Sequence, residues 1–560
     1  MKHFHRLCWT AVACAVHTSL VFAQPVASIP DASGQVQKSI ERSFEPLRQR
    51  PASVKPVAPV DVMGLESSES IDKLLAVQIQ DEQLQSKVQN YWSARIGQAV
   101  AAEDVQIFHA WLFDEARRTG YLSYATTSID KRAQGSVLVV KIVRPAIHSI
   151  RVISPSSELL THYSGLVAKR LEQDFRPGQP LDTLGLDQRL DSASYDLPVE
   201  LDATIRAVAA AEIDLVVTIH PAPSRSGQLL DSLVQVNNYG LRSYGRPQVL
   251  GSMTIGGHEP KATLNLVGQK SEGITYGRAE YEFASYGNAG RWRYWGAASN
   301  SHSILGGSAA TQGESRELGL GWSRIYGGYR DFVFQQHVEG SARSTESRLA
   351  STQAITGALR DNQVRFRATA DNSMLTSDAS RAEFIYTVGE YTRVNSIDID
   401  SLYGKLELNL RHHQSWSQDR SWYSVFRFRG QLSSGRLDSY NQLALGGTTG
   451  VRAYTTVDGI GDNGGVLNME LNHRLPDGST VGAFYDAGVI KLLSPKAGSL
   501  EYGKHYWLQA MGLQLSGQHQ NLFYNASLAK GIGGHKGWNS YNIESTPNNW
   551  RLYANATYRF

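Results

Sequence analysis

Cysteine, charge and long apolar runs are all scarce in this chain. The 560 residues include 2 cysteines, Cys8 and Cys14, and 19% charged residues, where about 25% is usual for a soluble protein. Because no cysteine follows Cys14, the remainder can form no disulfide and no cysteine-based metal site. After the N-terminus no stretch approaches the roughly 18 consecutive apolar residues of a spanning helix, which argues against a helical membrane protein.

Further absences narrow the function. The net charge is +3 and no long basic run is present, so a nucleic-acid partner is disfavoured. Nucleophile-elbow, zinc-protease and P-loop motifs are missing as well. We therefore predict no enzymatic activity, no catalytic or cofactor-binding residue and no metal ligand. The sequence is rich instead in Gly (51), Tyr (26) and Trp (11), and its hydrophobic content of 41% argues against a disordered chain.

Residues 1–23 are typical of a secretory signal peptide. Lys2 and Arg6 precede the apolar run Leu7–Val16, and small residues lead to a cleavage point after Ala23. A lipoprotein signal ending at Cys14 fits less well, because the residues before it lack the usual Leu. We therefore expect the protein to leave the cytosol.

Residues 24–60 combine a short amphipathic helix with a Pro-rich linker. The apolar face of this helix is formed by Val36, Ile40, Phe44 and Leu47, whose spacing of 4, 4 and 3 is helical. Prolines in the stretch 51–59 favour an extended, semi-rigid tether after it. From the residues alone, a solvated N-terminal tail is an equally good interpretation.

Residues 61–145 and 146–222 have the mixed pattern of two α/β domains. The expected helices are Glu82–Ile96, Ala102–Thr119, Leu159–Phe175 and Leu181–Ala193. The expected strands are Leu122–Ile129, Ser136–Val143, Ile147–Ile153, Glu200–Ala207 and Glu212–His220. The likeness between the two segments lies in the order of their elements and not in residue identity.

Residues 223–560 show apolar and polar residues in strict alternation. In Leu402–His413 one face is rich in Leu and the other in charged residues. In Trp550–Phe560 a face of aromatic residues, Leu and Ala alternates with a face of Arg, Tyr, Asn and Thr. Such alternation fits either a soluble β-sandwich or a transmembrane barrel. The strands are near the roughly 9–11 residues that cross a membrane, and the non-lipid face is rich in Arg, Glu and Asn. The Trp residues expected at the membrane interfaces are Trp292, Trp295, Trp416, Trp422 and Trp550.

The barrel is therefore the favoured interpretation. A sheet in hydrocarbon can have no open edge, because each unpaired backbone group there costs several kcal/mol. The length of this region allows about 16 antiparallel strands. The predicted fold is thus an α+β N-terminal region followed by an all-β transmembrane barrel.

One constellation stands out within the predicted barrel. A Gly-rich loop, 446–450, leads into Val451-Arg452-Ala453-Tyr454, and Phe484-Tyr485-Asp486-Ala487-Gly488 follows in a strand. Phe484, Asp486 and Gly488 share one face of that strand. If this face lines the lumen, a loop folded inward could bring Arg452 into bidentate contact with Asp486. An ordinary extracellular loop with a solvated arginine is an equal alternative at this point.

These motifs resemble those of a known family, the two-partner secretion transporters (TpsB class). The family is also called haemolysin secretion/activation proteins and belongs to the BamA-like superfamily. Residues 451–454 are similar to its V-R-G-[YF] loop motif, and residues 484–488 to its F-x-D-x-G strand motif. Tyr558 and the terminal Phe560 resemble the signal by which the assembly machinery recognises outer-membrane barrels. The resemblance covers nearly the whole chain after the signal peptide.

The resemblance implies a 16-stranded barrel in the outer membrane of a Gram-negative bacterium, with two POTRA domains in the periplasm. It implies that the helix at 33–48 can plug the pore, and that Arg452 pairs with Asp486 on the inner wall. The implied partners are a large exoprotein, such as an adhesin, cytolysin or contact-dependent toxin, the barrel assembly machinery and membrane lipid. Ala453 departs from the motif, which usually has Gly, and would be strained if this position required a positive φ.

The resemblance implies export of the exoprotein in an unfolded state by a two-partner, type V mechanism. An outer-membrane assembly factor of the same superfamily is the nearest alternative, although it would normally carry more repeats. A passive porin would not explain the α/β repeats. A surface adhesin or barrel hydrolase would need exposed binding loops or a Ser-His pair, neither of which is evident.

Overall fold

The computed structural model describes residues 70–560 with short gaps. The gaps are residues 119, 184, 210, 288, 306, 308–309, 330, 374–377, 395–400, 418, 494–504, 534–543 and 546–547. The predicted signal peptide and the predicted plug helix, with Val36, Ile40, Phe44 and Leu47, lie outside the described residues. Among the helices that are described, none is long and apolar enough to cross a membrane.

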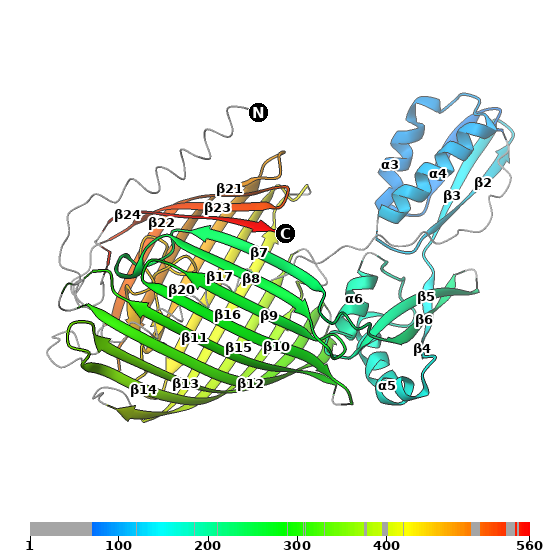
Figure 1. Cartoon of the computed structure of the whole chain (residues 1–560). Helices are drawn as coiled ribbons and strands as arrows, with labels where there is room; N and C mark the ends of the chain where they lie inside the picture. The colour runs from blue at the N-terminus through cyan, green and yellow to red at the C-terminus, as the bar shows by residue number, and fades with distance from the viewer. Residues whose placement is uncertain are drawn as a thin grey trace.

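Two α/β units of the same topology precede the barrel (Figure 1). The first contains β1 (Leu74–Ile79), α3 (Glu82–Trp92), η2 (Ser93–Arg95), α4 (Ala102–Arg118), β2 (Tyr124–Arg132) and β3 (Gly135–Val143). The second contains β4 (Ala146–Ile153), α5 (Ser157–Asp174), α6 (Leu186–Ala193), β5 (Val199–Ala209) and β6 (Glu212–Pro221). The central strand of each sheet is the last in sequence, β3 in the first unit and β6 in the second. It pairs in parallel with the first strand of its unit, β1 or β4, and antiparallel with the second, β2 or β5. The sequence analysis missed β1, which completes the likeness of the two units.

The helices of the units follow from the spacing of apolar residues. In α5 the buried residues Leu159, Tyr163, Val167 and Leu171 recur every four positions, which places them on one face against the sheet. Asp81 caps α3, since its carboxylate accepts hydrogen bonds from the backbone N–H groups of residues 83 and 84.

The barrel is closed and has 16 antiparallel strands, as predicted. The strands are β7 (Leu229–Asn237), β8 (Gln248–Gly256), β9 (Thr263–Lys270), β10 (Ile274–Ser285), β11 (Gly290–His302), β12 (Thr311–Tyr329), β13 (Phe332–Leu349), β14 (Ile355–Asp371), β15 (Ser380–Val394), β16 (Leu402–Ser415), β17 (Trp422–Ser433), β20 (Asn463–Arg474), β21 (Thr480–Lys491), β22 (His505–His519), β23 (Leu522–Gly531) and β24 (Trp550–Arg559). The last strand pairs with the first, from Asn555 opposite Asn237 to Arg559 opposite Leu233. This pairing removes the open edge that hydrocarbon would not tolerate.

The alternation along each strand separates an apolar outer face from a polar lumen. In β21, Val481 and Val489 are exposed on the outer face, while Asp486 is fully buried on the inner face. One expectation was wrong: Trp295 does not belong to an interfacial girdle. It points into the lumen, where its indole N–H donates to Glu317 at 2.8 Å. Its parity in β11 decides this, because Trp292 lies on the opposite face.

The second α/β unit is joined to one end of the barrel by buried polar contacts. Arg170 of α5 forms a bidentate pair with Asp196 at 2.7 and 3.1 Å. This pair binds both backbone groups of Ile325 in β12, since Arg170 donates to its C=O and Asp196 accepts from its N–H. The first unit lies further from the barrel (Figure 1).

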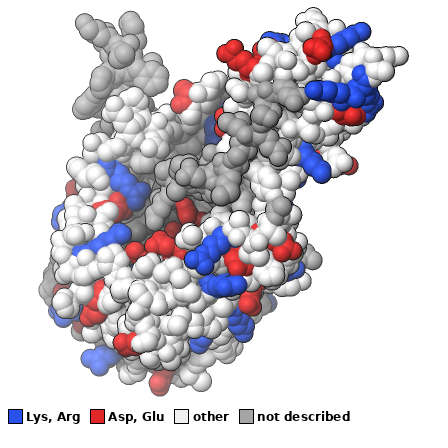
Figure 2. All heavy atoms as spheres, turned by 90° about the vertical axis from the view of Figure 1, so that its right-hand side faces the viewer, with Lys and Arg blue, Asp and Glu red and all other residues white. Residues whose placement is uncertain are grey.

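A lysine and an arginine add to the same junction. Lys261, in the turn between β8 and β9, donates to the C=O of Ser194 at 2.7 Å, and Arg291 donates to the C=O of Tyr195 at 3.2 Å. Burial, together with the charge of Arg291, lowers the pKa of Lys261 to about 8. In Figure 2, acidic and basic side chains are interspersed over the face where the units meet the barrel.

Candidate functional site

The chain between β17 and β20 folds inward as one long loop, residues 434–462, which we call the luminal loop. It contains the short pair β18 (Leu443–Ala444) and β19 (Ile460–Gly461). A tight turn reverses the chain beyond β18, and Gly447 has a φ of +105° there, which favours glycine. The residues after this turn are buried: Val451, Ala453 and Tyr454 have no exposed surface.

Arg452 at the tip of the luminal loop contacts Asp486 on the wall. Its Nε donates to Oδ2 at 2.9 Å and its Nη2 to Oδ1 at 2.8 Å, which is a bidentate pair. The backbone N–H of Arg452 donates to the same carboxylate at 3.0 Å. Asn468 of β20 supplies a fourth donor at 2.8 Å. The structure therefore brings together the two charged residues that the sequence motifs singled out.

The remaining donor of Arg452 is used as well. Its Nη1 donates to Glu470 and to Gln514, each at 2.9 Å. Glu470 also accepts from Arg427 of β17 at 2.7 Å. Two guanidinium groups thus face the two carboxylates of Asp486 and Glu470, so the charges of this group balance. We call this group, with Asn468 and Gln514, the tip anchor.

Packing around the tip anchor explains the other motif residues. The guanidinium of Arg452 lies 3.5 Å from the ring centroid of Phe484, a cation–π contact. A Cβ on Gly488 would lie 2.9 Å from the end of the Leu445 side chain, so a larger residue here would force this buried leucine to shift. Ala453 is not among the described residues with a positive φ. The strain expected from alanine at this position is therefore absent.

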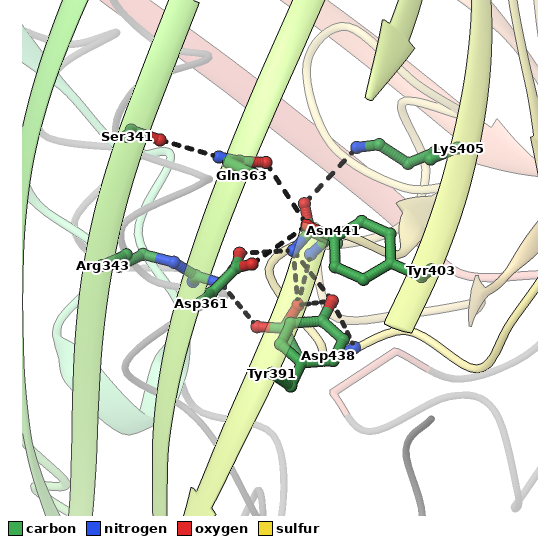
Figure 3. A network of polar contacts seen from close by, with 9 residues as sticks. All are labelled: Ser341, Arg343, Asp361, Gln363, Tyr391, Tyr403, Lys405, Asp438 and Asn441. Atoms are coloured by element: carbon green, nitrogen blue, oxygen red, sulfur yellow. Dashed lines mark hydrogen bonds and ion pairs between the residues drawn. The ribbon is translucent and has the colours of Figure 1, made fainter. Parts of the chain in front are cut away.

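A second polar cluster holds the start of the luminal loop against another part of the wall, formed by β13 to β16 (Figure 3). Arg343 of β13 donates through Nη2 to Asp361 of β14 at 3.1 Å and to Asp438 of the loop at 2.7 Å. Asn441 of the loop donates to Asp361 at 2.9 Å and to the Tyr391 hydroxyl at 2.9 Å. We call the following six residues the base anchor: Arg343, Asp361, Tyr391, Tyr403, Asp438 and Asn441.

The two tyrosines complete the base anchor. Tyr391 of β15 donates to Asp438 at 2.8 Å, and Tyr403 of β16 donates to Asp361 at 3.0 Å. Their rings stack with centroids 4.6 Å apart. Four neighbouring strands therefore contribute to one contact with the loop. The sequence analysis did not identify any of these residues.

The end of the luminal loop is tied to the closing strands of the barrel. Asp458 accepts from the backbone N–H of Glu544 at 3.1 Å and from the hydroxyl of Ser545. Glu544 in turn accepts from the backbone N–H of Arg242, in the loop after β7, at 3.0 Å. Tyr553 of β24 donates to the C=O of Tyr454 at 2.8 Å. The luminal loop thus contacts β24 directly and is linked to the loop after β7 through Glu544.

The other predicted site residues lie elsewhere. Tyr558 and Phe560 are exposed on the outer face at the end of β24, with ring centroids 5.0 Å apart. The backbone N–H of Phe560 donates to the C=O of Ser232 at 3.0 Å, which extends the pairing with β7. Their role as an assembly signal stays a prediction. Within the described parts of the chain, no group of three or more His, Cys, Asp or Glu side chains is placed to hold a metal ion.

Comparison with known proteins identifies the barrel. Residues 288–515 match the model of the haemolysin secretion/activation protein family ShlB/FhaC/HecB. The match lies within the barrel, from β11 to β22. The predicted resemblance to two-partner secretion transporters is thereby confirmed, and the protein is an outer-membrane transporter with a β-barrel pore.

Solved structures agree with this family at the level of the fold. CdiB from Escherichia coli is 17% identical, with a TM-score of 0.54 over 97% of this chain and 100% of that chain. CdiB from Acinetobacter baumannii is 14% identical, with a TM-score of 0.52 over 95% of this chain and 100% of that chain. No curated protein sequence matches the chain. The transporter lies in the outer membrane of a Gram-negative bacterium, with its POTRA-like α/β units in the periplasm.

Proposed function

We propose that this transporter recognises one large exoprotein in the periplasm and exports it unfolded through the barrel. The observation that carries the proposal is the luminal loop, whose Arg452 is held on the wall by Asp486 and Glu470. A passive porin has no need of a loop fixed in this way, nor of two α/β units at its periplasmic end. The α/β units of an exporter would bind the client before it enters the lumen.

The client would bind by adding a strand to an exposed sheet edge. The sheets have the order β1-β3-β2 and β4-β6-β5, so β2 and β5 are edge strands. In β5, Glu200, Asp202 and Thr204 are exposed alternately along the strand. An edge of this kind offers unpaired backbone groups to an extended segment. Folding of the client outside the cell would then prevent its return.

The test replaces Arg452 by alanine. Arg452→Ala should leave the barrel inserted, as shown by heat-modifiable mobility on a gel, and should reduce export of the client severely. Arg381→Ala is the matched control, because Arg381 is a luminal arginine of β15 that pairs with carboxylates of the wall. Normal export by the Arg452 variant would refute the role of the loop.

The client itself is found by comparing the secretomes of cells with and without the transporter. Loss of one large exoprotein supports the proposal. An assembly factor of the same superfamily would instead disturb many outer-membrane proteins when depleted, and that result would contradict the proposal.

The predicted plug helix is a separate part of the proposal. Residues 24–60 would occupy the lumen at rest and leave it when the client docks. Deletion of these residues should raise the ion conductance of the reconstituted pore. An unchanged conductance would rule out the plug and leave the export role untouched.

A further inference from the structure

The base anchor has a different charge balance from the tip anchor. At the tip, Arg452 and Arg427 face Asp486 and Glu470. At the base, the single guanidinium of Arg343 lies between the carboxylates of Asp361 and Asp438. Both carboxylates accept from the same nitrogen, Nη2. Lys405 reaches this cluster only through Asn441, at 3.5 Å, and pairs with Glu407 at 3.0 Å. The guanidinium of Arg343 is therefore the one cation that contacts Asp361 and Asp438 directly among the described residues.

Arg343 is also less completely hydrogen-bonded than Arg452. All three side-chain nitrogens of Arg452 donate to wall residues. In the part of the chain that the structure describes, Nε and Nη1 of Arg343 have no hydrogen-bond partner. Tyr440 stacks on this guanidinium, 3.7 Å from Cζ to the ring centroid. The base therefore holds its arginine by fewer hydrogen bonds to protein groups than the tip holds Arg452.

The tip anchor is also packed against more buried apolar residues than the base anchor. The tip lies in a cluster of twelve buried apolar residues that includes Leu445, Val451 and Tyr454. The base is covered by a cluster of four, which are Leu359, Tyr391, Tyr403 and Leu437. Buried apolar area supplies most of the stability of such contacts, whereas a buried ion pair contributes little net stability after desolvation. The base anchor is therefore the weaker of the two attachments.

We propose that the base anchor is a releasable latch. It opens while the tip anchor stays closed, so that the start of the luminal loop leaves the wall formed by β13 to β16. The path that this movement clears lies along that wall, which the client would follow. The use of the latch in export rests on the proposed function, but its opening is a property of the empty barrel and is tested without a client.

Hydrogen exchange of the full-length transporter measures the opening. In the unaltered protein, the amides of residues 437–441 should exchange faster than those of residues 451–455 at the tip. Arg343→Gln leaves two carboxylates facing each other without the guanidinium that they share and should speed exchange at the base by about tenfold, equivalent to about 1.4 kcal/mol. Exchange at the tip should stay the same.

Two further variants show whether charge causes the effect. Adding Asp438→Asn to Arg343→Gln removes one of the facing carboxylates and should return exchange at the base most of the way to its original rate. Arg293→Gln is the matched control, because Arg293 pairs with Glu339 of the wall and not with the loop. Equal exchange at base and tip, or no rescue by the second substitution, would overturn the latch.

A cross-link tests the role of the latch in export. The sequence has no cysteine after Cys14, so Asp361→Cys and Asn441→Cys can be joined selectively by a short, reducible bis-thiol reagent. Export by the double-cysteine protein should stop when the base is joined and resume on reduction. The single-cysteine variants treated with the same reagent should each export as they did before treatment. Continued export through the joined protein would overturn this role. If neither form exports a client, the proposed function has failed, and the exchange measurement still decides whether the latch exists.

Discussion

The two α/β units share one topology but are attached to the molecule differently. In the first unit α3 ends at Trp92, whereas the corresponding α5 of the second unit runs for 18 residues to Asp174. The last part of α5 carries Arg170 and Gln173, which bind the backbone of β12 at Ile325 and Gly328. The greater length of α5 and its buried Arg170 thus allow the second unit to dock on the barrel. In the described part of the chain, the second unit contacts the barrel through α5, and the first unit contacts the second through backbone hydrogen bonds.

Among the substitutions that test how the two units are attached, Arg170→Met should have the largest effect. Arg170 and Asp196 are almost completely buried, so removing one partner leaves an unpaired buried charge and should cost about 3–5 kcal/mol. The second unit should then lose its protection against proteases, while the barrel keeps its heat-modifiable mobility. The double variant Arg170→Met/Asp196→Leu should recover much of the internal stability of the unit. Full protease resistance of the single variant would show that the pair does not fix the unit.

More of the fold than of the candidate site could be predicted from the sequence. Alternation of apolar and polar residues over ten or more positions directly reflects lipid on one side and water on the other, so the barrel and its 16 strands were predictable. Strand β1 was missed because its sequence, LLAVQI, lacks such alternation. Trp295 was misassigned because aromatic residues at a strand end were counted without their parity.

The two anchors also differ in how far they could be predicted from the sequence. Arg452 and Asp486 could be paired from the sequence because each stands in a short motif, one in a Gly-rich loop and the other on one face of a strand. The base anchor combines residues from four strands and a loop, and each of them is an ordinary polar residue of a luminal face. Its partners are set by the register of β13 to β16 and by the path of the loop, which no local pattern contains.

A smaller effect is expected from Asp174 at the end of α5. Burial raises the pKa of Asp174 to about 6, helped by the facing Asp331 and opposed by Arg189. Because the pKa of Asp174 is raised in the docked state, protonation of this carboxyl favours docking. The gain in docking free energy is complete below the pKa of a free carboxyl and is lost as the pH rises through about 6.

Asp174→Asn should remove this dependence. Docking at neutral pH should be strengthened by roughly 1 kcal/mol after allowance for solvent screening. The measurement is hydrogen exchange of α5 between about pH 5 and pH 7, corrected for the intrinsic pH dependence of exchange. Glu172→Gln, at an exposed position of the same helix, is the control and should change nothing. The same pH dependence in both variants would exclude Asp174 as its source.

The smallest effect should come from the joint between the two units. Arg144 pairs with Asp81 at 2.7 Å and lies 5.5 Å from the ring centroid of Tyr121. Its side chain is 24% exposed, so the pair contributes less than about 1 kcal/mol. Arg144→Ala should therefore broaden the distribution of distances between the units without unfolding either one.

Spin labels on cysteines at the exposed positions Glu103 and Glu172 would measure this distribution. Arg132→Ala is the matched control, since Arg132 pairs with Asp130 of its own strand and is half exposed. Backbone hydrogen bonds from Leu122 to Leu181 and from Thr183 to Gly120 also join the units, and they should keep the mean distance unchanged. A distribution as narrow as that of the control would show that these backbone contacts alone fix the joint. The first unit would then be held as firmly as the second, and the difference between the two units would lie only in their distance from the barrel.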